Sequence, residues 1–455
     1  MNLQEAVYDR PGRFMNGNFG FRWEYPANTY RCLSIPSVSY MGGNWDDFFI
    51  NENGVAFTAS VTGYASDEAY QADPTIPDGI REECMATIVG PMARTAREAV
   101  ELLAGLIDRY GHIDSDIVMV ADRKEAWYME IYTGHQYCAV RMPDDAVAVF
   151  GNEFMLDTVD PDSDDVICSK ELFSLPRKHG FAVMDANGRM NLRRTYSGDG
   201  RLYDPCHMRT WRGHQLLSPS TSHEYDRSEY YPFFFKPDFK VDLATVRQLY
   251  RDRYEGTAFN PEETGSTTTR VIGYETQSEV HILEVFDNVP KEMTCVAWVC
   301  MSEAAHAPFI PFTVNATHMN EHYAYDAPVA GYDTNSAFIL YKRVNAICSM
   351  NRKIFSEKVK FHWAKSEQDI EDNFREAYSR ATAIYASSPD KAAEILIDFE
   401  VKAQDDCIRD AKRIFEEMCL YLMSYSQTYP YGYVLTNHPE LKDFPEFKLS
   451  RVASE

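Results

Sequence analysis

Asn152 is a residue that could take part in chemistry, because it follows the short apolar stretch Ala146–Phe150 and Gly151. The apolar stretch predicts a buried strand, and a glycine at its end lets another backbone approach closely. An amide in this position can donate a hydrogen bond to a substrate carbonyl on which negative charge develops. The alternative is that Asn152 caps a turn, as asparagine commonly does. The local pattern leaves both interpretations open.

A second group of interest is the basic cluster Arg209, Arg212 and His214 around Trp211, in a chain with 69 acidic residues. A guanidinium group can bind a carboxylate through two parallel hydrogen bonds. Arg209 or Arg212 is therefore a candidate for binding a substrate carboxylate. An internal network of ion pairs is the alternative explanation of the cluster.

The sequence contains none of the common metal or nucleotide signatures. It has no P-loop, no H-E-x-x-H and no zinc-type spacing of cysteine and histidine. The acidic stretch Asp157–Asp165 lacks the glycine and the final glutamate of a calcium-binding loop, so it is predicted to be a solvated loop. No metal and no cofactor are therefore expected.

The elements that position Asn152 are predicted to be antiparallel hairpins. Short apolar runs are separated by polar turns, which is typical of such hairpins. The predicted strands are Ile117–Ala121, Ala126–Ile131, Tyr137–Val140 and Ala146–Phe150. Trp127, Met129 and Ile131 alternate on one face of the second strand. An earlier hairpin is predicted over Phe48–Phe57, because Asn53-Gly54 is a strong turn signal.

Helices and further strands complete an α+β pattern. Thr95–Gly111 is predicted to be a helix that starts with a capping box, and Leu243–Tyr254 a shorter one. More strands are expected at Thr269–Ile272, Val280–Val285, Thr294–Met301 and Phe309–Val314. From Glu367 onward the pattern is helical, with Ser388-Pro389 between two helices, and Pro430–Glu455 is expected to be a loosely held tail.

Composition excludes several classes of function. The net charge of -24 argues against binding to nucleic acid or to anionic lipid. The N-terminus lacks the apolar segment of a signal peptide, and no apolar run is long enough to span a membrane. Ten scattered cysteines without a C-x-x-C pair favour reduced thiols in the cytoplasm.

Several phrases in this order resemble the dipeptidase family of N-terminal nucleophile hydrolases, which is related to secernin. The resemblance covers the chain from about residue 20 onward. The phrases are Ile50–Ala56, Thr95–Leu103, Asp122–Trp127 with Glu130, Gly134-His135, Arg141, Pro143–Asp145, Asn152, Pro232–Asp238, Arg251–Thr257 and Pro308–Phe312.

This resemblance implies a four-layer αββα sandwich and the hydrolysis of dipeptides without a metal. We expect the core to span residues 1–365, with C-terminal helices and a tail over 366–455. The expected partners are short peptides and further copies of the chain. In the family, a cysteine at the mature N-terminus attacks the peptide carbonyl and its own α-amine acts as base.

The resemblance also suggests roles for individual residues. Asn152 would donate to the oxyanion, Asn51 and Glu52 would shape the pocket, and Arg209 or Arg212 would bind the carboxylate of the dipeptide. The alternatives are an amidase of the same fold that acts on a non-peptide amide, and a non-catalytic paralogue.

The beginning of this sequence departs from the family pattern. It starts with Met1-Asn2, and the opening strand pair that carries the family's cysteine is not found. We therefore expect that an N-terminal segment is missing. Cys32 is the one internal candidate for the nucleophile, if processing exposes it, and otherwise it is a structural cysteine.

Expressed from Met1, the chain is expected to show no peptidase activity, because this mechanism needs the thiol and a free amine on one residue. Mass analysis of the N-terminus combined with a dipeptide hydrolysis assay tests this expectation. Hydrolysis by a chain that still begins with Met1 or Asn2 would contradict the mechanism. Hydrolysis by a chain that begins with Cys32 would support the mechanism and contradict the missing segment.

Overall fold

The computed structural model describes residues 2–4, 12, 14–16, 21–36, 46–61, 63–200, 202–324, 335–426 and 446–450. The chain divides into two compact units, and each is described separately. The first unit comprises Met1–Val241 and Val285–Cys295, and the second comprises Asp242–Glu284 and Val296–Glu455.

The first unit is built on an eight-stranded sheet in which every neighbouring pair of strands is antiparallel. Its strand order is β1-β4-β5-β6-β7-β8-β9-β10. These strands are β1 (Asn2–Gln4), β4 (Cys32–Pro36), β5 (Asp46–Asn51), β6 (Ala56–Val61), β7 (Asp116–Ala121), β8 (Ala126–Ile131), β9 (Tyr137–Arg141) and β10 (Val166–Cys168). A separate hairpin consists of β2 (Phe14–Asn16) and β3 (Arg22–Glu24).

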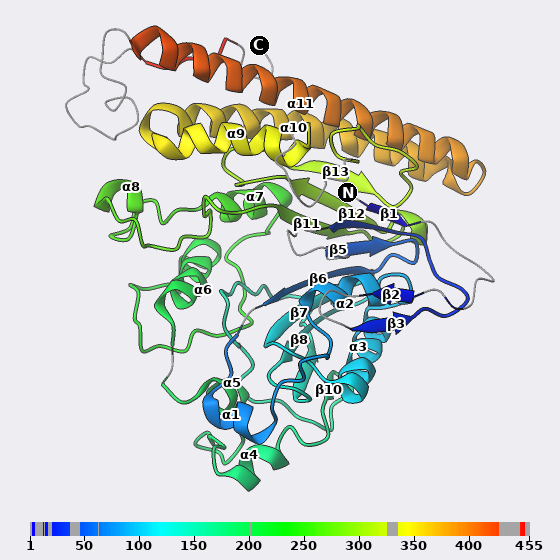
Figure 1. Ribbon diagram of the computed structural model, residues 1–455, viewed down its shortest axis with the longest axis vertical. Helices are drawn as coiled ribbons and strands as arrows, with labels where there is room; N and C mark the ends of the chain where they lie inside the picture. Colours follow the sequence, from blue (N-terminus) through cyan, green and yellow to red (C-terminus); the bar gives the residue numbers. More distant parts are fainter. Residues whose placement is uncertain are drawn as a thin grey trace. The chain divides into compact units, whose positions relative to one another are not determined.

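Two helices cover one face of this sheet. They are α2 (Glu82–Val89) and α3 (Ala96–Tyr110), which lie along β5 to β8 (Figure 1). Trp127, Met129 and Ile131 of β8 belong to the apolar core on this face, as their alternation predicted. Thr95 accepts a hydrogen bond from the Glu98 amide at the start of α3, which confirms the predicted cap.

The other face of the sheet packs against the middle of the chain. Tyr128 of β8 and Tyr132, which directly follows this strand, belong to a second apolar core that includes Phe154, Tyr196 and Phe233. The short helices of this part of the unit are α1 (Asp67–Ala72), α4 (Ser174–His179), α5 (Leu192–Ser197) and α6 (Asp204–Leu217). The candidate site is built on this second face.

A late segment of the chain covers the turn of the β5–β6 hairpin. Gly54 has a φ of 79°, and a Cβ there would lie 2.6 Å from the Thr294 Cβ. Lys291, in the short 3-10 helix η2 (Lys291–Met293), donates to the Asn53 Oδ1 at 3.0 Å. Residues 285–295 therefore return to the first unit and close this turn, which confirms the predicted Asn-Gly hairpin.

The second unit combines a three-stranded sheet with long helices. The sheet has the order β11 (Val280–Val285), β12 (Cys295–Cys300) and β13 (Ile310–Thr313). The helices are α7 (Leu243–Arg251), α8 (Pro261–Thr264), α9 (Ala337–Met350), α10 (Arg352–Tyr385) and α11 (Pro389–Ser426). Helices α10 and α11 pack against each other and against β13 (Figure 1).

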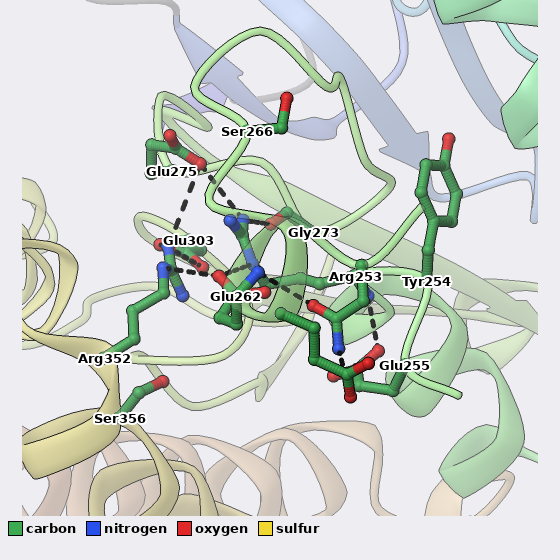
Figure 2. A network of polar contacts seen from close by, with 12 residues as sticks. Arg253, Tyr254, Glu255, Glu262, Ser266, Gly273, Glu275, Glu303, Arg352 and Ser356 are labelled. Carbon is green, nitrogen blue, oxygen red and sulfur yellow. Dashed lines mark hydrogen bonds and ion pairs between the residues drawn. The ribbon is translucent and has the colours of Figure 1, made fainter. Parts of the chain in front are cut away.

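A partly buried ionic cluster fixes the irregular segment between α7 and β11. Arg253 binds Glu262 at 2.9 Å and Glu275 at 3.1 Å, and Arg352 binds both oxygens of Glu303 at 2.8 Å (Figure 2). Burial alone would raise the pKa of Glu303. His306, Arg352 and Arg253 have the larger combined effect and lower this pKa to about 2. Ionic contacts thus hold this segment where regular secondary structure is sparse.

Most of the predicted elements are confirmed, and four are wrong in detail. The helical pattern expected from Glu367 begins earlier, because α10 starts at Arg352 and is preceded by α9. Ala146–Phe150 is not a strand, because Val147 forms only an isolated bridge to Phe235. Thr269–Ile272 is irregular, and its carbonyls bond side chains instead of a neighbouring strand: the Tyr254 hydroxyl donates to the Arg270 carbonyl at 3.0 Å, and the Gln277 Nε2 donates to the Ile272 carbonyl at 3.3 Å. The helix predicted over Leu243–Tyr254 ends at Arg251. The predicted tail lies outside the described residues except for residues 446–450.

The α+β class is confirmed by the antiparallel sheet, its covering helices and the helical C-terminal part. The four-layer αββα arrangement and the division at residues 365/366 stay predictions. Within the described part of the chain, no helix combines the length and the apolar character needed to cross a bilayer.

Glu400 on α11 is a fully enclosed carboxyl group that faces Thr313 of β13. Burial raises its pKa to about 8 from the ordinary 4.5, although the hydroxyl and the amide of Thr313 act in the opposite direction. In the unfolded chain the group ionises near its ordinary pKa. The folded state therefore loses stability relative to the unfolded state as the pH rises from 4.5 through about 8.

Replacing Glu400 with glutamine should raise the melting temperature at a pH of about 9 and leave it nearly unchanged at a pH of about 4. The gain should correspond to a few kcal/mol, because a carboxylate no longer has to be buried. Glu394→Gln is the matched control, since this glutamate is exposed on the same helix. An equal shift at both pH values would contradict the account.

Candidate active site

The loop Gly151–Leu156, here called the site loop, lies against helix α6. A Cβ on Gly151 would come within 2.3 Å of the Cys206 carbonyl oxygen, so only glycine allows this approach. The Gly151 amide donates to the Thr210 hydroxyl at 3.1 Å. A Cβ on Gly213 would similarly clash with Val149, at 2.2 Å. The backbone that precedes Asn152 therefore packs directly against α6.

The buried carboxylate of Glu130 on β8 anchors the other end of the site loop. Its oxygens accept hydrogen bonds from the amides of Met155 and Leu156. They also accept from the hydroxyls of Tyr128 at 2.7 Å and Tyr132 at 2.8 Å. Burial raises the pKa of Glu130, while these four donors act against that rise. The loop is thus held by a fixed acceptor inside the core.

Helix α5 forms a third support. The Arg193 amide, in the first turn of α5, donates to the Leu156 carbonyl at 2.7 Å, and the Leu192 amide donates to the Asp157 carbonyl at 2.7 Å. Asn191 caps this helix by accepting from the Arg194 amide. Side chains from α5 are therefore positioned relative to the same loop.

Glu153 is an ionised carboxylate within this arrangement. It accepts from the Thr210 hydroxyl at 2.5 Å, and it lies 3.3 Å from the His207 Nδ1 and 3.5 Å from the Arg193 Nη2. Burial alone would raise its pKa, but the hydrogen bond with His207 and the charge of Arg193 lower the pKa below its ordinary value. The site therefore contains a fixed negative charge beside a buried guanidinium.

The amide of Asn152 is oriented by Arg209. The Arg209 Nη2 donates to the Asn152 Oδ1 at 2.7 Å, and its Nε donates to the Pro205 carbonyl at 2.9 Å. A guanidinium carries donors only, so the amide must present its oxygen to Arg209. The Nδ2 group, which is a donor, is then on the other side of the amide. Nδ2 is the atom that donation to an oxyanion would use.

Asn152 and Glu153 line a cavity of about 360 Å³. Its aromatic walls come from Tyr64, Phe154, Tyr203 and Tyr230. Arg193, Ser197, Gly198 and Leu202 complete the lining. A cavity with apolar walls and a few fixed polar groups is the usual form of a small-ligand site. Among the described residues, no cluster of His, Cys, Asp or Glu has the geometry of a metal site.

The other predicted site residues lie at different positions. Arg212 is buried on α6 and contacts Gln215. Asn51 is buried at the end of β5, where its side chain bonds the carbonyls of Gly90 and Ala93 and the amides of Asn53 and Val55. Glu52 accepts from the Arg31 amide at 3.0 Å.

Cys32 is enclosed in β4, opposite Asn51 in the register of the β4–β5 pair, and β1 covers its other edge. Burial, with the nearby charges of Asp46 and Glu52, raises the pKa of its thiol, which disfavours the thiolate. The structure thus brings Asn152 and Arg209 together, and separately groups Cys32, Asn51 and Glu52. The roles predicted for all these residues stay predictions.

The model of peptidase family C69 matches residues 6–365. This chain belongs to that family. It is 30% identical over 355 residues to a probable dipeptidase B of Streptococcus pyogenes serotype M1, covering 75% of this chain and 70% of the relative. It is 28% identical over 416 residues to a probable dipeptidase B of Lactococcus lactis subsp. lactis, covering 85% and 82%. The resemblance inferred from the sequence is confirmed, and this C69 member is a peptide hydrolase by family.

Among solved structures, the chain matches a penicillin V acylase from Agrobacterium tumefaciens with a TM-score of 0.29 and 13% identity. The match covers 69% of this chain and 77% of the acylase. At that TM-score the likeness supports no conclusion about this family member.

Sequence reasoning assigned no role to Glu130, Glu153 and Arg193. The alternation in β8 places Glu130 on the face opposite Trp127, between two tyrosines, and this is a signal for a buried carboxylate with hydroxyl partners. For Arg193 there is no such signal, because it is one of two adjacent arginines in a short helix.

If the Asn152 amide donates to the oxyanion, Asn152→Asp should lower kcat of the active enzyme by about 10²–10³. Aspartate keeps the contact with Arg209 but has no amide donor, so the melting temperature should be unchanged. Asn152→Ala should give a similar loss of kcat. A lower melting temperature with an unchanged kcat per folded molecule would instead assign Asn152 to a turn cap.

Proposed function

We propose that the active enzyme to which this chain belongs is a dipeptidase that hydrolyses short peptides by an N-terminal cysteine mechanism. The observation that carries the proposal is the Asn152 amide, whose oxygen is held by Arg209 and which lines a cavity in a C69 family member. Two relatives named probable dipeptidase B support the choice of substrate.

In the proposed reaction, the N-terminal thiolate attacks the carbonyl carbon of the peptide bond, and its own α-amine accepts the thiol proton. An amine with a pKa near 8 is suited to this task at neutral pH. The carbonyl oxygen becomes an oxyanion, which the Asn152 Nδ2 stabilises. The amine of the departing residue takes up the proton, and water then releases the acyl group from the sulfur.

The supporting residues of the site loop would keep this donor in place. Glu130 and α6 hold the loop at both ends, so the amide does not have to reorganise as charge develops on the substrate. We also propose the cytoplasm as the compartment, because all ten cysteines are free thiols. Dipeptides are the proposed substrates, and assembly with further copies of the chain remains a prediction.

The test is a substrate panel with enzyme from its native source, whose first residue is determined by mass spectrometry. Dipeptides should be hydrolysed, and acetylation of the N-terminal amine should abolish their hydrolysis, because the base is lost. N-acyl amino acids and β-lactams are the comparison substrates. Hydrolysis of these substrates without any turnover of dipeptides would replace the proposal by an amidase, and no turnover at all would refute it.

A further inference from the structure

One of the residues that line the cavity has a buried guanidinium whose hydrogen-bonding capacity is not fully used. The Arg193 side chain is only 2% exposed, and Arg193 lines the cavity. Its Nη1 donates to the Tyr231 carbonyl at 3.2 Å. Its Nη2 has no hydrogen-bond partner among the described residues. Buried donors are nearly always paired, so this exception calls for an acceptor.

Glu153 does not supply that acceptor. Its nearest oxygen is 3.5 Å from the Arg193 Nη2, which is longer than a charge-assisted hydrogen bond. The carboxylate of Glu153 is instead engaged by the Thr210 hydroxyl at 2.5 Å, with His207 at 3.3 Å. The Arg193 guanidinium therefore lies near a negative charge, but this charge does not accept a hydrogen bond from its Nη2.

Arg193 is also held rigidly. The guanidinium carbon lies 4.8 Å from the centre of the Tyr230 ring, which is a cation–π distance. Its backbone amide is bound to the Leu156 carbonyl of the site loop. A donor fixed before binding loses little entropy when a ligand arrives.

We propose that Arg193 binds the free carboxylate of the peptide substrate. This inference rests on the proposed dipeptidase function and names the group that the cavity recognises. In a dipeptide the carboxylate belongs to the residue after the scissile carbonyl, with ~3.8 Å between the two Cα atoms. Both groups must therefore be bound in one cavity, and Asn152 and Arg193 line the same one.

The rim of the cavity indicates the side chain that accompanies this carboxylate. Tyr64 and Tyr203 line the cavity and are 73% and 62% exposed, which is unusual for large aromatic residues. A ligand side chain that packs on either ring would cover apolar ring surface that water now contacts. The preferred ligand is thus a dipeptide with an apolar or aromatic second residue.

Binding of Ala-Phe and of its C-terminal amide to the 455-residue chain, measured by calorimetry, tests the proposal. We expect Ala-Phe to bind about tenfold to hundredfold more tightly, because only the free acid offers a charged acceptor. Arg193→Gln should abolish this preference, and Arg193→Lys should retain part of it. Arg194→Gln is the matched control, since Arg194 is the next residue and pairs with Asp199 at 2.7 Å.

Thermal melting establishes that each variant is folded. If Arg193→Gln does not fold, the assignment is tested by the binding of Ala-Phe and of its amide to the wild type and to Arg193→Lys. Equal binding of the acid and the amide by the wild type, retention of the full preference by Arg193→Gln, or no binding of either peptide would each overturn the assignment. If the native enzyme hydrolyses dipeptides while the preference is absent, only this inference fails. Failure of the dipeptidase proposal would appear in the substrate panel.

Discussion

The carboxylate of Glu130 is the interaction on which the arrangement of the site depends. It lies inside the core and accepts from two tyrosine hydroxyls and from two backbone amides of the site loop. Without these acceptors, the amides of Met155 and Leu156 would be buried donors, which is an unfavourable state. The sheet therefore determines where the loop lies, and the loop determines where Asn152 and Glu153 lie.

Helices α5 and α6 supply the charged side chains that lie next to the site loop. Arg209 of α6 orients one amide, and Arg193 of α5 stands beside a carboxylate that Thr210 and His207 already engage. Asn152 is held by Arg209, and Glu153 is held by Thr210 and His207, all of which belong to α6. A site made in this way binds and stabilises charge without rearranging, which is the usual basis of electrostatic catalysis.

The strands that carry the frame could be predicted from the sequence, because their alternation and turns are local signals. Strand β8 and the cap of α3 at Thr95 are where those signals placed them. The strand expected over Ala146–Phe150 does not form, because this segment packs on α6, which lies about sixty residues later in the sequence. Asn152 could be singled out for the same local reasons. Arg193 could not, because its importance arises from contacts with residues that are distant in the sequence.

The return of residues 285–295 to the first unit has a consequence for biosynthesis. This segment supplies Lys291 and Thr294 to the turn at Asn53-Gly54, yet it is made only after residues 242–284, which belong to the second unit. The part of the protein that contains the cavity is therefore still incomplete when residue 241 leaves the ribosome. The two units cannot mature strictly one after the other, and translation must proceed beyond residue 295 before the first is closed.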